Sequence, residues 1–73
     1  MSFPRKEIVE EIKKDYPVGS RVKLVRMYDL YTNIPIGTLG TVRNVDDIGT
    51  IHIDWDTGHK IGVAYGVDEC EKI

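Results

Sequence analysis

The sequence has few of the features that fasten or tether a small protein. Its 73 residues include one cysteine, Cys70, so no intrachain disulfide and no Cys-x-x-Cys metal knuckle can form. No apolar run approaches the roughly 20 residues of a membrane-spanning helix, and residues 1–7 lack the apolar stretch of a signal peptide. We therefore expect a protein of the reducing cytoplasm, without membrane contact.

Motifs of catalysis are missing as well. The sequence contains no phosphate-binding loop, no dinucleotide fingerprint and no Gly-x-Ser-x-Gly elbow. A chain this short buries only about 60% of the surface of its unfolded form, which leaves little room for a deep cleft. We interpret Cys70 as structural, and we expect neither an enzyme nor a cofactor.

A metal site is considered and set aside. His52, Asp54, Asp56 and His59 lie close together in the sequence, and Asp56-x-Gly58 faintly resembles a calcium loop. The pattern lacks the later Glu of such a loop, whereas Asp-x-Gly is ordinary turn chemistry. We therefore predict a turn at these residues and no metal ligand.

Helical periodicity is confined to residues 4–15. Ser2 is the predicted N-cap, and Pro4 fits the first turn, where its missing N–H is harmless. Pro17 disfavours helical geometry in the residue before it, so the helix should end at Tyr16. The apolar stripe of this helix consists of Ile8, Val9, Ile12 and Tyr16. The spacing predicts an N-terminal amphipathic helix within residues 1–17.

The rest of the chain, 18–73, consists of short apolar segments separated by turn signals, a pattern typical of small barrels. The predicted strands are 21–26, 40–45, 50–55, 60–64 and 70–73. Residues 28–39 form a loop too apolar for a flexible linker, and we expect it to fold back against the strands. The prediction is one mainly β domain: a small SH3-like five-stranded barrel, with the N-terminal α-helix covering one open end or one edge strand.

The most regular feature is a predicted hairpin around Asp56-Thr57-Gly58. A three-residue turn with glycine in the left-handed position fits this sequence. The strand before it alternates and faces Trp55 inward, which favours a core position for Trp55 over a groove-lining one. The predicted pairs are Trp55 with His59, Ile53 with Ile61, Ile51 with Val63 and, on the outer face, Asp54 with Lys60.

Three segments carry a resemblance: Gly-Ser-Arg-Val-Lys-Leu (19–24), Gly-Thr-Leu-Gly-Thr-Val (37–42) and Gly-Thr-Ile-His-Ile-Asp-Trp-Asp-Thr-Gly (49–58). They resemble a family of short, uncharacterised bacterial proteins, a domain of unknown function found on mobile elements. They are more distantly similar to the Mind-bomb/HERC type of SH3-like barrel. The resemblance covers about 18–73 and implies a barrel fold and an accessory role on a mobile element. It defines no binding residue.

Charge is distributed unevenly along the chain. The net charge of −2 argues against a general nucleic-acid binder. Residues 1–28 carry seven basic and four acidic side chains, whereas residues 29–73 carry three basic and eight acidic ones. The carboxylates of the second part are Asp29, Asp46, Asp47, Asp54, Asp56, Asp68, Glu69 and Glu71. All of them except Asp29 are interpreted either as a solvated surface or as a phosphate-mimicking face that blocks the DNA-binding channel of a host nuclease, as an anti-CRISPR-like anti-defence inhibitor would.

Aromatic residues suggest a different surface. Tyr28 directly precedes residues 29–36 of the loop and Tyr31 lies within them, and tyrosines in such loops make good protein contacts. Our first hypothesis is a non-catalytic small module that binds a protein partner. Under the alternative hypothesis of an inhibitor, that partner is a nuclease. A third hypothesis is a nucleic-acid-binding barrel, using Arg5, Lys6, Lys13 and Lys14 of the helix. The candidate partner-binding residues are Tyr28, Asp29, Tyr31, Asp46, Asp47, Asp54 and Asp56; a homodimer is compatible with so thin a core.

Overall fold

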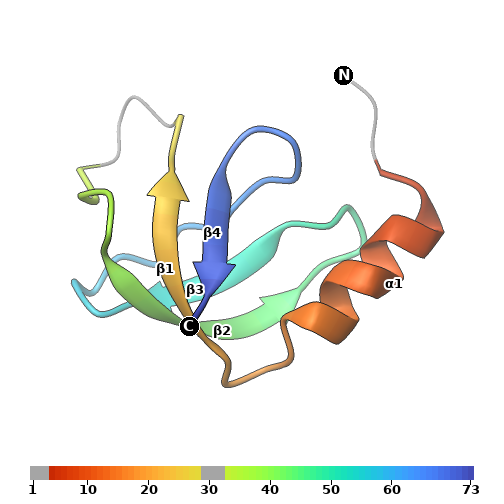
Figure 1. Ribbon diagram of the computed structural model, residues 1–73, viewed down its shortest axis with the longest axis horizontal. Coiled ribbons are helices and arrows are strands. Elements are labelled where there is room, and N and C mark those ends of the chain that lie inside the picture. Colours follow the sequence, from red (N-terminus) through yellow and green to blue (C-terminus); the bar gives the residue numbers. More distant parts are fainter. Residues whose placement is uncertain (1–3, 29–32) are drawn as a thin grey trace.

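The computed structural model describes residues 4–28 and 33–73 of the chain. This part contains one helix, α1 (Lys6–Asp15), and four strands, β1 (Arg21–Arg26), β2 (Leu39–Val45), β3 (Ile51–Trp55) and β4 (Glu69–Lys72). The strands form one antiparallel sheet in the order β3-β2-β1-β4 (Figure 1). The mainly β fold with one N-terminal helix is therefore confirmed.

Helix α1 begins later than predicted and ends where predicted. Its N-cap is Arg5, whose side chain makes no capping hydrogen bond, and Pro4 precedes the helix instead of lying in its first turn. Ser2, the predicted cap, lies outside the described residues. At the other end the Tyr16 N–H donates to the Ile12 carbonyl at 2.9 Å, and Pro17 prevents continuation.

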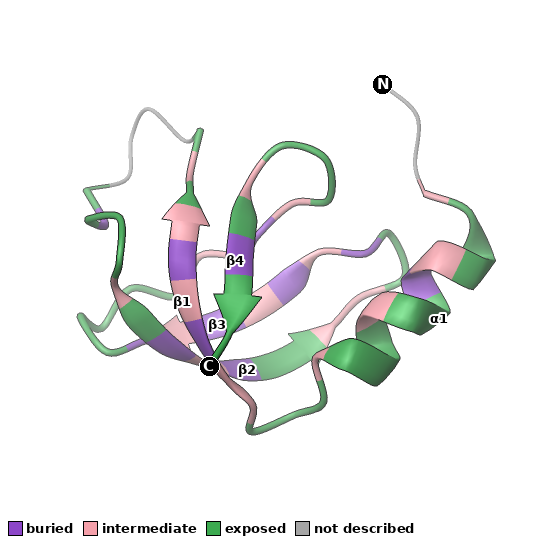
Figure 2. Cartoon of the chain, in the orientation of Figure 1, coloured by how far each residue is buried: buried purple, intermediate pink, exposed green. Residues whose placement is uncertain are grey.

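The core lies on the inner face of the sheet, because inward-facing residues alternate with outward-facing ones along each strand (Figure 2). Val22, Leu24, Val42 and Ile53 are almost completely buried. Ile34, in the loop before β2, also joins this core, and the Gly37 N–H donates to the Leu24 carbonyl at 2.8 Å. Among the described residues of this loop, Ile34 folds back against the strands as predicted, whereas Ile36 is 62% exposed.

The hairpin turn after β3 has the predicted geometry. The Trp55 N–H donates to the His59 carbonyl at 3.0 Å, and the Gly58 N–H donates to the Trp55 carbonyl at 2.9 Å. Gly58 has a φ of 95°, a left-handed conformation that glycine adopts readily. Trp55 is buried, and a Cβ placed on Gly40 would lie 2.8 Å from its Cε3 atom. The core interpretation of Trp55 is confirmed.

The predicted fourth strand at 60–64 and the closed five-stranded barrel are wrong. In this fully described segment only Val63 pairs with β3, through a bridge to Ile51. The Ile61 carbonyl accepts the indole N–H of Trp55 at 2.9 Å, so the expected ladder with Ile53 is interrupted. The final strand, β4, pairs with β1 at the opposite side of the sheet. The described part thus holds a curved four-stranded sheet with an opening between β3 and β4.

Candidate functional site: a groove beside strand β4

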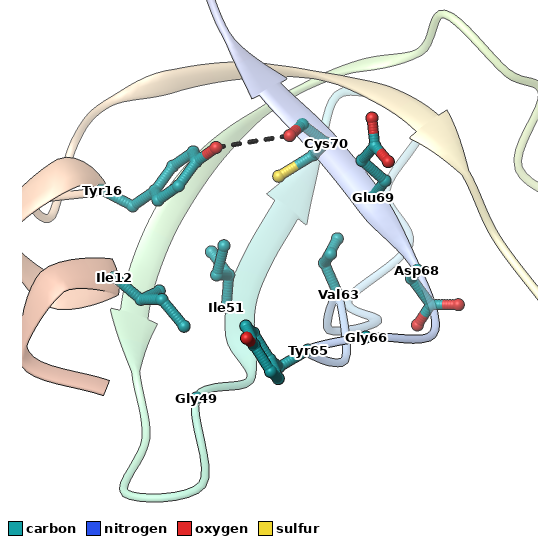
Figure 3. A pocket seen from close by; sticks show the side chains of 10 residues that line it. All are labelled: Ile12, Tyr16, Gly49, Ile51, Val63, Tyr65, Gly66, Asp68, Glu69 and Cys70. Carbon is teal, nitrogen blue, oxygen red and sulfur yellow. Dashed lines mark hydrogen bonds between the residues drawn. The ribbon is translucent and has the colours of Figure 1, made fainter. Parts of the chain in front are cut away.

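The opening between β3 and β4 forms a groove of about 160 Å³ (Figure 3). We call it the β4 groove. Ile12 of α1, Tyr16 at the helix end, Ile51 of β3 and Cys70 of β4 line it. The loop between β3 and β4 contributes further residues; they include Val63, Tyr65, Gly66 and Asp68. Its walls are mainly apolar.

Helix α1 reaches the groove because the turn between β2 and β3 has no side chain at Gly49. A Cβ at that position would lie 3.3 Å from Ile12 Cδ1 and 3.2 Å from Pro4 Cγ. Gly49 also has a φ of 82°, which other residues rarely adopt. Glycine therefore permits both the turn and the close approach of the helix that forms one wall.

Cys70 forms part of the groove wall, but its thiol is not activated. Burial first, and then the negative charge of Glu69, raise the pKa of Cys70 to about 11. A nucleophilic cysteine needs a lowered pKa, because the thiolate is the reactive form. At neutral pH Cys70 is a small apolar side chain in the groove wall.

Tyr16 links the helix end to the strand. Its hydroxyl donates a hydrogen bond to the Cys70 carbonyl at 3.3 Å (Figure 3). Burial, followed by the charges of Cys70 and the carboxylates nearby, raises the pKa of Tyr16, so the hydroxyl remains a donor. The Lys72 ammonium also donates to the Asp15 carbonyl at 2.8 Å, which holds the helix end beside β4.

Within the described residues, strand β4 has backbone groups on the groove side that pair with no other strand. The Ile73 N–H donates to the Arg21 carbonyl at 3.0 Å, which identifies this pair as a bonded one. Bonded and non-bonded pairs alternate in an antiparallel ladder, so the pairs Val22–Lys72 and Leu24–Cys70 are of the non-bonded kind. The N–H and C=O groups of Cys70 and Lys72 therefore point away from β1. Tyr16 satisfies one of them, the Cys70 carbonyl.

The predicted acidic surface is interleaved with basic side chains. Among the residues that the structure describes, four ion pairs join the basic first part of the chain to the acidic second part: Arg21–Asp56 at 2.6 Å, Lys23–Glu71 at 3.1 Å, Lys13–Asp47 at 3.3 Å and Arg26–Glu69 at 3.7 Å. The predicted pair Asp54–Lys60 is present at 3.6 Å, and Arg43 lies 3.7 Å from the same carboxylate oxygen. Folding therefore mixes the two charges that the sequence separates.

Asp46 and Asp56 stabilise turns. The Asp46 carboxylate accepts the N–H groups of Ile48 at 3.1 Å and Thr50 at 3.0 Å, and it lies 2.8 Å from His52 Nε2. Burial opposes its ionisation, but these hydrogen bonds outweigh it and lower the pKa of Asp46. The bidentate hydrogen bond from Arg21 lowers the pKa of Asp56. Both carboxylates have structural partners on their own chain.

The candidate partner-binding residues are not brought together. Asp46 and Asp47 follow β2, whereas Asp54 and Asp56 lie at the other end of β3, which is roughly 17 Å long. Tyr28 is 65% exposed, beneath the Arg26 guanidinium at 5.7 Å, and its N–H donates to the Asp68 carboxylate. Asp29 and Tyr31 lie outside the described residues.

Sequence reasoning missed the groove because it assumed that residues 60–64 close the barrel. One signal was available. Gly62 lies in the middle of that segment, and glycine inside a strand often marks a close approach of another group. In the structure a Cβ on Gly62 would lie 2.6 Å from Thr50 Cγ2. The glycine allows close packing against the start of β3 without forming a strand.

No group of three or more His, Cys, Asp or Glu side chains within 4–28 and 33–73 is placed to hold a metal ion. His52 faces Asp46, while His59 Nδ1 lies 2.7 Å from Thr57 Oγ1. Within the same ranges no helix has the length and apolar character needed to cross a membrane.

Fold and groove define a small, mainly β protein with one helix and an open sheet edge. Residues 5–73 match the family described as domain of unknown function DUF4314, and the chain belongs to this family. No curated protein and no solved structure matches it. The predicted membership in a family of unknown function is confirmed, whereas the family description names neither a fold nor a function.

Proposed function

We propose that this protein is a non-catalytic module that binds an extended segment of another protein in the β4 groove. The observation that carries the proposal is the groove itself, an apolar hollow open at an edge of the sheet. The partner class is the one that the sequence suggested, a protein. The contact surface moves from the 29–36 loop to residues that the structure brings together from α1, β3 and β4.

The size of the groove supports a peptide side chain as its occupant. Sites for small molecules and cofactors usually enclose about 300–1,000 Å³, whereas the β4 groove measures about 160 Å³. An aliphatic side chain on a partner segment fits this space better than a whole ligand does. Tyr65, which is 49% exposed at the groove, offers the amphipathic ring that protein contacts favour.

Two other proposals have less support. A phosphate-mimicking nuclease inhibitor requires carboxylates gathered on one surface, but Asp47 lies at the opposite end of β3 from Asp54 and Asp56. A nucleic-acid binder requires a basic surface, and Lys13 of the helix is paired with Asp47. The mobile-element setting, the likeness to Mind-bomb/HERC domains and the cytoplasmic location remain part of the proposal.

A peptide-library selection with two matched tyrosine variants tests the groove. Peptides are selected on the immobilised protein, and their binding is measured for wild type, Tyr65→Ala and Tyr28→Ala. Both tyrosines are exposed, but only Tyr65 lines the groove. We expect Tyr65→Ala to weaken binding at least about tenfold and Tyr28→Ala to leave it unchanged.

Two results would contradict the proposal. A loss of binding in Tyr28→Ala alone would place the contact surface at the end of β1. Failure to select any peptide that shifts the amide resonances of Ile51, Val63 and Cys70 would remove the groove as a protein-binding site.

A further inference from the structure

Beside the β4 groove lies a strand with one free side. Strand β4 pairs with β1 along one edge. On the other edge the backbone groups of Cys70 and Lys72 point outward, as the alternation of the ladder requires. A row of unpaired N–H and C=O groups is a template on which another extended chain can pair.

Side chains on β4 determine what kind of strand fits. Cys70 is buried and lines the groove, whereas Glu69 and Glu71 are exposed; Glu69 also contributes to the groove lining. A strand added beside β4 would direct the side chain opposite Cys70 into the groove. The two flanking side chains would lie opposite Glu69 and Glu71, where positive charges are favourable and negative ones are not.

We propose that the free edge of β4 binds its partner by strand addition, and that the partner segment carries an apolar residue between two basic ones. This inference rests on the proposed function and specifies its partner. Backbone hydrogen bonds to Cys70 and Lys72 hold the segment, the groove receives its apolar side chain, and the two glutamates select its charges.

The existing contacts at this edge are weak enough to be replaced. Glu69 and Glu71 already pair with Arg26 at 3.7 Å and Lys23 at 3.1 Å, but all four side chains are about half exposed. Exposed ion pairs contribute little to stability, so an incoming cation can share these carboxylates. The Tyr16 hydroxyl holds the Cys70 carbonyl at the long distance of 3.3 Å. A partner N–H can take its place.

A second copy of this chain fits the edge poorly. Antiparallel pairing of β4 with another β4 brings Glu71 opposite Glu71, or Glu69 opposite Glu71, depending on the register. Like charges directly opposite each other destabilise a strand pair. The charge pattern of β4 therefore favours a basic partner over self-association.

Synthetic peptides test this inference. The probe is a capped peptide in which lysine alternates with valine; its controls are the same peptide with glutamate for lysine, and one N-methylated at the amides that face β4. We expect the first to bind at low salt and to slow hydrogen exchange of the Cys70 and Lys72 amides. The glutamate peptide should not bind, and N-methylation should weaken binding at least about tenfold, because it removes the backbone donors.

Matched variants separate the edge from general electrostatics. Glu71→Lys should weaken binding of the lysine–valine peptide at least about tenfold, whereas Asp47→Lys, the same charge change at a remote and 98% exposed side chain, should leave it within about twofold. Tyr16→Phe frees the Cys70 carbonyl and should tighten binding several-fold.

The outcomes distinguish this inference from the proposed function. If library-selected peptides occupy the groove but N-methylation and Glu71→Lys have no effect, strand addition is wrong and groove binding stands. If Cys70 and Lys72 amides are already protected in a dimer without peptide, the edge belongs to a second copy and the inference is overturned. If no peptide of either kind reaches the groove, both proposals fail.

Discussion

The two outer edges of the sheet are finished in different ways. At β3 the following segment covers the edge, with Val63 paired to Ile51 and the Trp55 indole bonded to the Ile61 carbonyl. At β4 the Tyr16 hydroxyl donates a hydrogen bond to the Cys70 carbonyl at 3.3 Å. Within the described residues, packed side chains and backbone therefore cover the β3 edge, whereas one long side-chain hydrogen bond contacts the β4 edge. The difference is what our proposal uses: the β3 side would serve stability and the β4 side would serve binding.

A larger side chain packed against β3 should lower the free energy of unfolding more than one placed in open space. We predict that Gly40→Ala destabilises the protein by about 3 kcal/mol, because its methyl group would meet Ile53 Cγ2 at 2.5 Å and Trp55 at 2.8 Å. Urea unfolding followed by Trp55 fluorescence measures the change. In Gly37→Ala the new Cβ would have no heavy atom within 4 Å, so this variant measures only the cost of a left-handed backbone conformation in alanine. We expect that cost to be about 1 kcal/mol of unfolding free energy. Equal losses in both variants would contradict close packing at Gly40.

At the β4 edge, the Cys70 thiol should react slowly with alkylating reagents. A pKa raised from 9.0 to about 11 leaves about 100-fold less thiolate at neutral pH. We expect alkylation by iodoacetamide to be at least that much slower in the folded protein than in urea. Because folding disfavours the thiolate, stability should also decline as the pH rises above 9. Rapid labelling of the folded protein would show that β4 detaches easily.

A matched pair of variants compares the two edges directly. Trp55→Phe removes the donor to Ile61 and leaves a cavity, and we predict a loss of about 2 kcal/mol. Tyr16→Phe removes one long hydrogen bond and should cost less than about 1 kcal/mol. Thermal unfolding of both variants checks the order. A larger loss for Tyr16→Phe would mean that the β4 edge is the structural one.

The smallest expected effect is on the stability of the protein at low pH. Asp46 has a lowered pKa in the folded protein, so its contribution to stability is present above its ordinary pKa of 3.8 and is lost as the pH falls through the lowered value. Asp46→Asn should therefore reduce stability at about pH 6 and flatten its decline towards about pH 3. Asp47→Asn removes the same charge from the same turn and serves as the control. An unchanged acid profile for Asp46→Asn would contradict this role.

Local patterns in the sequence predicted most of the elements correctly. The alternation around Val22 and Ile53 and the proline after Tyr16 act through neighbouring residues, so they determine strand faces and the helix end. Closure of the barrel depended instead on whether residues 60–64 form a strand, and in the structure the Ile61 carbonyl accepts the Trp55 indole N–H. A side-chain hydrogen bond of this kind has no periodic signature.

The candidate site was harder to predict for the same reason. Its walls come from residues as distant as Ile12 and Cys70, and each has an ordinary explanation where it occurs in the sequence. Tyr16 fits the helical stripe, and Cys70 is interpreted from the sequence as structural. The sequence shows that basic residues precede acidic ones along the chain. It does not show that the two kinds form ion pairs, because that pairing depends on which strands become neighbours.

The central position of β1 has a consequence for how the chain folds. Its two neighbours are β2 and β4, and Lys72 contacts Asp15, 57 positions away. Such long-range closure is slow, since the loop entropy is lost before the contacts form. Any chain shortened before residue 69 would leave Val22 and Leu24 on an exposed strand prone to aggregation. Loss of residues 69–73 would thus turn β1 from a central strand into an edge strand.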